Sequence, residues 1–225
     1  MRNFLLFLFI VFFISSCSNK KQLIYISDVR NNILAKVKNL DSNKIEFGDV
    51  LKIDIHSDIH EAAVPYNNFV NTASINNIDQ LIIDGYFVDN NLNISLPLLG
   101  TIDVSNLSEN ELSKKIEQLL VENGHLTSPY VKVKKINSKF TVLGEVNSPG
   151  TFPFYDNKLN IFQALGYAGD LQITAKRNNI TLIREENGLR KTYKVSLTKS
   201  ELLEKPFYYI KNNDVLIVYP NFSKV

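Results

Sequence analysis

The fold class is indicated by residues 106–136, "NLSENELSKKIEQLLVENGHLTSPYVKVKKI", where a helical pattern gives way to a strand pattern. Ser108 and Glu111 have the spacing of a capping box, which predicts that a helix begins here. Apolar side chains then recur at helical spacing, at Leu112, Ile116, Leu119 and Leu120. Gly124 suits the position after a helix that takes positive φ, and Pro129 prevents the helix from continuing.

Strands are predicted around this helix. Apolar and polar residues alternate in "YVKVKKI", residues 130–136, and in "LKIDIH", residues 51–56, as expected for half-buried strands. Residues 86–88 and 92–96 have the pattern of two strands of one hairpin, joined by the turn "DNN". The asparagine-rich segment 61–79 has no period, so we expect a long loop there.

A second small unit follows. "FTVLGEVNSPGTFPF", residues 140–154, combines a strand with a turn whose proline and glycine set the backbone angles. "LNIFQALGYAGD", residues 159–170, predicts a short helix that Asn160 caps and Gly169 ends. Three further strands are expected at residues 179–185, 191–197 and 214–220. This gives about four strands around one helix, and the whole chain is assigned to the α+β class.

The first residues have the layout of a secretory signal. The apolar run Phe4–Ile14 follows a single charge, Arg2, and is shorter than the roughly 20 apolar residues that span a bilayer. Small residues precede Cys17, the only cysteine, and "ISSC" resembles the lipobox of bacterial lipoproteins. This resemblance implies cleavage before Cys17 and lipid attachment to its thiol. The alternatives are a secreted protein with an incidental cysteine and a plain membrane anchor.

Composition narrows the function classes. The formal net charge is +2 and 21% of the residues are charged, which is ordinary for a globular protein and too weakly basic to indicate nucleic-acid binding. A single cysteine cannot form a disulfide within the chain, which fits a separate use beside the signal. Residues 18–40 lack clear periodicity apart from one short element expected at 33–37, so we expect a tether there.

Several segments resemble a known family in the same order along the chain. The first set is similar to the polysaccharide export domain of outer-membrane polysaccharide export lipoproteins, of which the Wza-like translocon components are examples. These segments are residues 45–55, 85–120 and 127–136. The second set is similar to the soluble-ligand-binding β-grasp (SLBB) domain that follows it in that family, and comprises residues 140–154, 159–171, 178–185 and 210–220. The most specific pair is "LGEVNSPG" followed by "ALGYAGD".

The resemblance implies a role and partners. Members of this family form ring-shaped homo-oligomers in the periplasm, are anchored to the outer membrane and pass capsular polysaccharide or exopolysaccharide outward. They work with an inner-membrane, Wzc-like copolymerase, and no enzymatic step or cofactor is expected of them. The residues after Cys17, "SNKK", lack the acidic cluster of surface-export signals, so we expect a lipid anchor that faces the periplasm.

Two features differ from the larger members of that family. Only one β-grasp domain is expected here, whereas larger members have more. No apolar stretch of about 20 residues follows Tyr219, although the larger members use a C-terminal amphipathic helix to build the outer-membrane pore. We therefore expect either a separate outer-membrane pore protein as a further partner or a different outer-membrane step.

The expected organisation has four parts. They are a cleaved lipoprotein signal peptide at 1–16, a lipidated N-terminus and linker at 17–42, a small mixed-sheet polysaccharide export domain at 43–137 and a β-grasp-like SLBB domain at 138–225.

Catalytic and metal-binding alternatives rest on few residues. The chain has three histidines, His56, His60 and His125. The first two are four apart, as in helical zinc motifs, but they follow a strand and no glutamate lies between them as the zinc-protease motif requires. Asp84, Asp89 and Asp103 could form a carboxylate pair for glycoside cleavage, yet they lie beside turns where aspartate holds the backbone. We expect no catalytic residue and no metal site.

A periplasmic glycan-binding or scaffolding module that does not conduct polymer is the alternative function. Its candidates for stacking on sugar rings are Tyr155, Tyr167, Tyr193, Tyr208 and Tyr209, which could instead pack in cores or interfaces. Its candidates for attracting an acidic polymer are Lys36, Lys38, Lys132, Lys134 and Lys135, which could instead be solvated faces. The oligomeric state distinguishes the two functions. A conduit must form a closed ring, whereas a binding module can remain monomeric.

Overall fold

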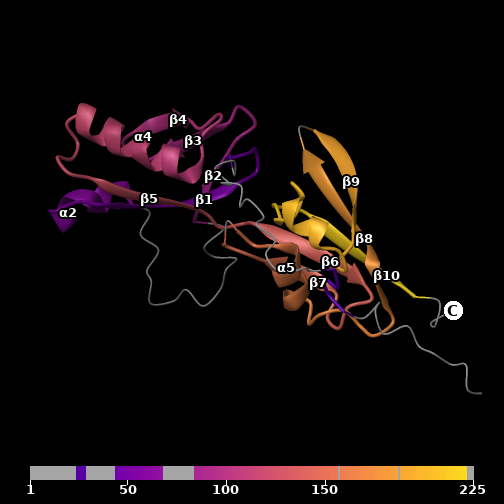
Figure 1. Ribbon diagram of the computed structural model, residues 1–225. Helices are drawn as coiled ribbons and strands as arrows, with labels where there is room; N and C mark the ends of the chain where they lie inside the picture. The colour runs from indigo at the N-terminus through magenta and orange to yellow at the C-terminus, as the bar shows by residue number, and fades with distance from the viewer. Residues whose placement is uncertain (1–23, 29–43, 68–83, 157, 187, 222–225) are drawn as a thin grey trace, which may run out of the picture.

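The computed structural model describes residues 24–28, 44–67, 84–156, 158–186 and 188–221. Figure 1 shows two lobes, each with its own sheet and helix. The first lobe comprises the described residues from 44 to 136, and the second lobe those from 138 to 221, with a separate hydrophobic core in each. The mixture of helices with mostly antiparallel sheets confirms the α+β class. No helix among the described residues is long and apolar enough to cross a membrane.

The first lobe packs one long helix against a three-stranded antiparallel sheet and a hairpin. The sheet has the order β2-β1-β5, formed by β1 (Val50–His56), β2 (Tyr86–Phe87) and β5 (Tyr130–Lys135). The remaining elements are α2 (His60–Ala63), the 3-10 helix η2 (Val64–Tyr66), β3 (Asn93–Leu96), β4 (Gly100–Asp103) and α4 (Glu109–Glu122). The alternation predicted for residues 51–56 and 130–136 is confirmed, because the apolar pair Ile53 and Val133 faces the core.

Helix α4 forms where its local signals predict it. The Ser108 side chain accepts a hydrogen bond from the Glu111 backbone, and the Glu111 carboxylate accepts one from the Ser108 backbone at 2.8 Å, which completes the capping box. Leu112, Ile116 and Leu120 are fully buried against the sheet. The sequence therefore determines both where this helix begins and which face it buries.

The hairpin predicted between residues 86–88 and 92–96 is wrong. Strand β2 pairs with β1, with Val50 opposite Phe87, and β3 pairs with β4 instead. A turn does lie between β2 and β3, because the Asp89 carboxylate accepts two backbone hydrogen bonds there. The predicted turn is therefore present, but a turn does not specify which strand becomes the ladder partner.

The segment predicted as a loop at 61–79 is partly helical. Residues 60–66 form α2 and η2, with Ala63 and Tyr66 buried against the first lobe. Residues 68–79 of that segment, and the element expected at 33–37, lie outside the described residues.

The second lobe covers one face of a five-stranded sheet with a short helix. Its strands have the order β7-β6-β10-β8-β9, and only the β6–β10 pair is parallel. The strands are β6 (Lys139–Gly144), β7 (Gly150–Pro153), β8 (Ala175–Glu186), β9 (Leu189–Val195) and β10 (Val215–Pro220). The helices are α5 (Ile161–Tyr167) and the 3-10 helix η4 (Ser200–Glu204). The predicted Asn160 cap is confirmed, and Gln163 completes a second capping box.

Residues 24–28 pack against the second lobe. They fall inside the stretch expected to be a tether, yet Ile26 and Ser27 donate backbone hydrogen bonds to Leu197 and Thr198 at 2.8 and 3.0 Å. Prediction of an element from sequence relies on a periodic pattern of apolar residues. This five-residue segment has no such pattern, and its hydrogen-bond partners lie far away in the sequence.

Candidate functional site

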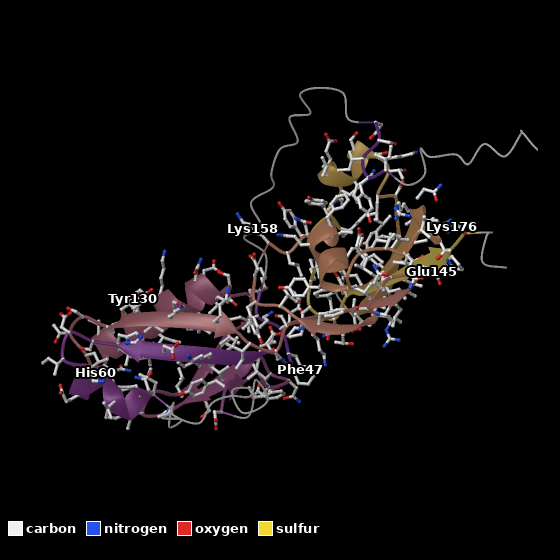
Figure 2. The ribbon with its side chains drawn as sticks, turned by 90° about the horizontal axis from the view of Figure 1, so that it is seen from below. Phe47, His60, Tyr130, Glu145, Lys158 and Lys176 are labelled. Carbon is white, nitrogen blue, oxygen red and sulfur yellow. The ribbon has the colours of Figure 1, made fainter. Side chains whose placement is uncertain are left out.

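The outer face of the β1–β5 pair carries charged and aromatic side chains in register. Asp54 lies opposite Lys132, and His56 lies opposite Tyr130. Tyr130 is 62% exposed and its ring stacks on the His56 imidazole with 6.2 Å between centroids. Figure 2 shows Tyr130 and His60 on the first lobe, away from Glu145 and Lys176 on the second. This face offers an aromatic platform beside a cationic side chain, a combination suited to an acidic glycan.

The three predicted β5 lysines have different environments. The Lys135 ammonium lies 2.6 Å from the buried Asp49 carboxylate, so its role is structural. The Lys134 ammonium lies 3.6 Å from the carboxylate of Glu109 in α4. Only Lys132 of the three is exposed, whereas the other two are partly buried. Lys36 and Lys38 lie outside the described residues.

The five predicted tyrosines divide into packed and exposed rings. Tyr193 packs against Phe207 with 4.7 Å between ring centroids, and Tyr208 packs edge-on against Phe162 at 6.3 Å. Tyr209 is part-buried beside Tyr208. Tyr155 and Tyr167 are 43% and 52% exposed, and the Tyr167 ring also packs against the rings of Phe140 and Phe152, with 5.8 and 6.2 Å between centroids. The interpretation as packing residues therefore holds for the first three and in part for Tyr167, whereas Tyr155 and the exposed part of Tyr167 are accessible to a ligand.

The two most specific sequence motifs meet in the second lobe. The loop after β6 lies against the C-terminal end of α5, where Ser148 donates a backbone hydrogen bond to Ala168 at 2.8 Å. The Asn147 side-chain amide donates to the Gly169 carbonyl at 2.6 Å. The segments "LGEVNSPG" and "ALGYAGD" are therefore in direct contact in the folded domain.

Comparison with known families gives one match for each of the two lobes. Residues 38–135 match the model described as polysaccharide biosynthesis/export protein, and residues 138–218 match that of the SLBB domain. The chain belongs to the polysaccharide biosynthesis/export family. A comparison with curated proteins found no match. The first lobe is therefore the export domain and the second the SLBB domain, and together they support a role in polysaccharide export. Neither family is a catalytic one.

Histidines of the export domain do not converge. His56 is the last residue of β1, His60 begins α2, and the His125 Nδ1 atom lies 2.8 Å from the Tyr66 hydroxyl. Among the described residues, no three His, Cys, Asp or Glu side chains are grouped closely enough to hold a metal ion.

The predicted aspartates hold turns. Asp89 accepts hydrogen bonds from the backbones of Asn91 and Asn93, and Asp103 accepts one from the backbone of Ser105, each at 2.8 Å. Asp84 comes just before β2. These contacts favour the backbone role over a carboxylate pair for Asp89 and Asp103. Cys17 lies outside the described residues.

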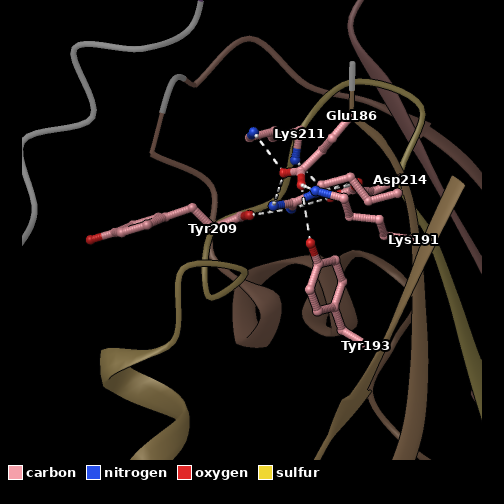
Figure 3. A network of polar contacts seen from close by, with 7 residues as sticks. Glu186, Lys191, Tyr193, Tyr209, Lys211 and Asp214 are labelled. Carbon is pink, nitrogen blue, oxygen red and sulfur yellow. Dashed lines mark hydrogen bonds and ion pairs between the residues drawn. The ribbon is translucent and has the colours of Figure 1, made fainter. Parts of the chain in front are cut away.

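The SLBB domain contains a buried polar network that was not predicted from the sequence. Arg184 pairs with Asp214 through two hydrogen bonds of 2.8 and 2.6 Å and donates a third to the Tyr209 carbonyl at 2.6 Å (Figure 3). Both side chains are almost fully buried. Arg184 shares the inward parity of Ile180 and Leu182 in the predicted strand, and this signal could have shown that it needs a partner.

Glu186 extends this network toward solvent. Its carboxylate accepts hydrogen bonds from the Lys211 and Lys191 ammonium groups and from the Tyr193 hydroxyl (Figure 3). Burial raises the pKa of Glu186, but these hydrogen bonds outweigh it and lower that pKa to about 2. Ion pairs and hydrogen bonds of Glu186 therefore connect β8 with β9 and with the segment before β10.

Replacing Glu186 with glutamine is expected to lower the free energy of unfolding by about 1–2 kcal/mol at neutral pH, allowing for half-exposed lysine partners. A lowered folded pKa stabilises the protein above the unfolded pKa. The difference between variant and wild type should therefore be constant above about pH 5 and disappear as the pH falls toward 2. Urea titrations across this pH range measure it. The matched change Glu185→Gln, at an exposed pair with Arg190, should give less than about 0.5 kcal/mol at every pH. A Glu186→Gln difference that does not vary with pH contradicts the assignment.

Proposed function

We propose that this chain is a periplasmic, outer-membrane lipoprotein of a capsular polysaccharide or exopolysaccharide export machine, with lipid on Cys17. It assembles into a homo-oligomeric ring that forms or lines a conduit for the polymer. The work is non-enzymatic and needs no cofactor. Its partners are the polysaccharide and an inner-membrane copolymerase.

The observation that carries this proposal is the order of the two domains in one chain. An export domain followed directly by an SLBB domain is the arrangement of the family, and no part of either match indicates a catalytic family. The lipobox-like "ISSC" in front of them supports the lipid anchor. The aromatic and cationic strip at Tyr130 and Lys132 offers a surface that could contact the passing polymer.

The test is native mass spectrometry of the protein extracted from cells in mild detergent. We expect wild type to carry a lipid-sized mass increment on a ring of identical subunits. Cys17→Ala should lose the increment and keep the mass of the uncleaved signal peptide, because the cleavage motif is lost with the cysteine. Ser16→Ala keeps a small residue before the cleavage point, so it should behave as wild type.

Polysaccharide at the cell surface is the functional readout of the same variants. In a strain lacking the chromosomal copy, wild type and Ser16→Ala should restore the polymer, whereas Cys17→Ala should not. A lipidated monomer would exclude a ring that assembles by itself. That result would favour the glycan-binding module, for which the exposed Tyr155 and Tyr167 rings provide a surface.

A further inference from the structure

The outer face of the β2-β1-β5 sheet consists of four rows of facing residues. Side chains alternate between the two faces of a strand, and the inner ones fill the core of the export domain. The outer residues face each other as Val50 with Phe87, Lys52 with Lys134, Asp54 with Lys132 and His56 with Tyr130. An aromatic ring therefore lies in the first row and in the last row, and lysines occupy the two rows between them.

Aromatic rings are exposed at both ends of this face. At one end Phe47 lies edge-on to Phe87, with 6.2 Å between ring centroids, and the two rings are 63% and 56% exposed. At the other end the exposed Tyr130 ring stacks on the His56 imidazole. Figure 2 shows Phe47 and Tyr130 toward opposite ends of the sheet. The six residue steps of β1 between the two aromatic rows cover about 20 Å, so a ligand that contacts both ends must be a chain.

Lysines outnumber carboxylates in the two middle rows. Three lysines, Lys52, Lys132 and Lys134, accompany one aspartate, Asp54. The Lys52 ammonium lies 3.3 Å from the Asp54 carboxylate, and Lys134 has its partner in α4, where the Glu109 carboxylate lies 3.6 Å away. Lys52 and Lys134 also lie directly opposite each other, and like charges in that position destabilise a sheet. An anion bound over these rows would offset that repulsion.

We propose that this outer face is a binding strip for an acidic, carboxylate-bearing polysaccharide that lies along β1. The members of the strip are Phe47, Phe87, Tyr130, Lys52 and Lys132. A sugar ring has an apolar face that packs on the aromatic rings at the two ends, and its carboxylate interacts with the lysines between them. The inference rests on the proposed export function and makes the exported polymer an acidic one.

Fluorescence anisotropy with a labelled oligogalacturonate measures this binding. Each ring of that probe carries one carboxylate, its methyl ester keeps the rings without charge, and an oligoglutamate of equal length keeps the charge without rings. With the full-length protein extracted from cells in mild detergent, we expect the oligogalacturonate to bind about tenfold or more tightly than either comparison probe. Its affinity should fall as salt is added. Absence of binding, or equal affinity for either comparison probe, would overturn the proposal.

Hydroxyl-radical footprinting locates the bound probe without any substitution in the protein. Oxidation of the Phe47, Phe87 and Tyr130 rings should decrease when the oligogalacturonate is bound. The methyl ester is the reference, because it scavenges radicals to a similar extent without binding. Tyr219 of β10 is 38% exposed and lies in the SLBB domain, so its oxidation should not change. Protection of Tyr219 equal to that of Tyr130 would mean that the probe binds elsewhere.

Substitutions separate the aromatic from the charged contacts. Tyr130→Ala and the double variant Lys52→Gln with Lys132→Gln should each weaken oligogalacturonate binding about tenfold. Only the lysine variant should also flatten the dependence of affinity on salt. Tyr219→Ala and Lys194→Gln remove an exposed ring and an exposed lysine of the SLBB domain, and both should bind as wild type. Wild-type affinity in both strip variants would contradict the strip.

The strip and the proposed function can fail separately. Normal lipidation, ring assembly and surface polymer, together with no binding of the oligogalacturonate, would refute the strip alone. Absence of lipid on Cys17 or of a ring would refute the proposed function, whereas the footprint and the variant affinities would still decide whether the strip binds an acidic glycan.

Discussion

Replacing Arg184 with methionine is expected to lower the free energy of unfolding of the SLBB domain by about 3–5 kcal/mol. Methionine preserves much of the side-chain volume but leaves the Asp214 carboxylate buried without its bidentate partner. It also removes the hydrogen bond to the Tyr209 carbonyl. The chain has no tryptophan, so urea titration followed by circular dichroism and tyrosine fluorescence measures the effect.

A double variant separates the unpaired charge from lost packing. Arg184→Met with Asp214→Leu removes both charges, and most of the lost stability should return because no buried ion remains. Arg190→Met is the control. It removes an exposed ion pair between Arg190 of β9 and Glu185, which lies opposite it in β8, and should change the free energy of unfolding by less than about 0.5 kcal/mol. If the double variant were no more stable than Arg184→Met, the destabilisation would come from packing instead of charge.

The second large effect is expected from Gly144→Ala, at about 4 kcal/mol or more. Gly144 has a φ of +92° at the end of β6, and a Cβ atom there would lie 2.0 Å from the backbone oxygen of Val218. That oxygen belongs to β10 and accepts a hydrogen bond from Glu145 at 3.0 Å, so the clash falls on the parallel β6–β10 ladder. Backbone cannot move aside as the end of a flexible side chain can.

Gly188→Ala is the matched control. Gly188 also has positive φ, at +71°, but no atom lies within 4 Å of the position that a Cβ atom would occupy there. It should therefore cost only the conformational strain, about 1–2 kcal/mol. The difference between the two alanine variants in urea titrations isolates the steric contact. Equal losses at the two positions would mean that φ alone accounts for the effect.

Local signals are sufficient to predict the helices α4 and α5 and most strands, but not the short helices α2, η2 and η4. The Ser108–Glu111 box and the Asn160 cap act within one turn of chain, so the sequence contains everything needed to locate α4 and α5. Alternation likewise identifies β1, β5 and four of the five SLBB strands, because burial on one face of a strand requires it; the short β7, which follows the predicted turn, was not expected.

Pairing between distant segments cannot be predicted in this way. The sequence pattern pairs β3 with the neighbouring strand across a turn, whereas the structure pairs it with β4. Arg184 and Asp214 lie 30 positions apart and Tyr25 and Asp170 lie 145 apart, and no local pattern relates the members of either pair. Such contacts depend on which surfaces the folded elements bring together.

The same limit applies to the candidate functional residues. The sequence identifies aromatic and basic side chains by type, but only the fold separates the exposed Tyr155, Tyr167 and Lys132 from the packed Tyr193 and the buried Lys135 ion pair. Burial of a lysine or tyrosine depends on neighbouring elements, so residue type alone does not distinguish a ligand contact from a structural one.

Strand β10 comes last among the described strands in sequence, yet it lies between β6 and β8 in the SLBB sheet. A polypeptide that is threaded from its N-terminus through a translocation channel would therefore present β6, β7, β8 and β9 before the strand that joins them. Until Val215–Pro220 emerges, β6 and β8 each lack one of their two ladder partners. In a chain that takes this route, the order would delay folding of the SLBB domain until its last strand had crossed, and the chain would stay extended while it passed through the channel.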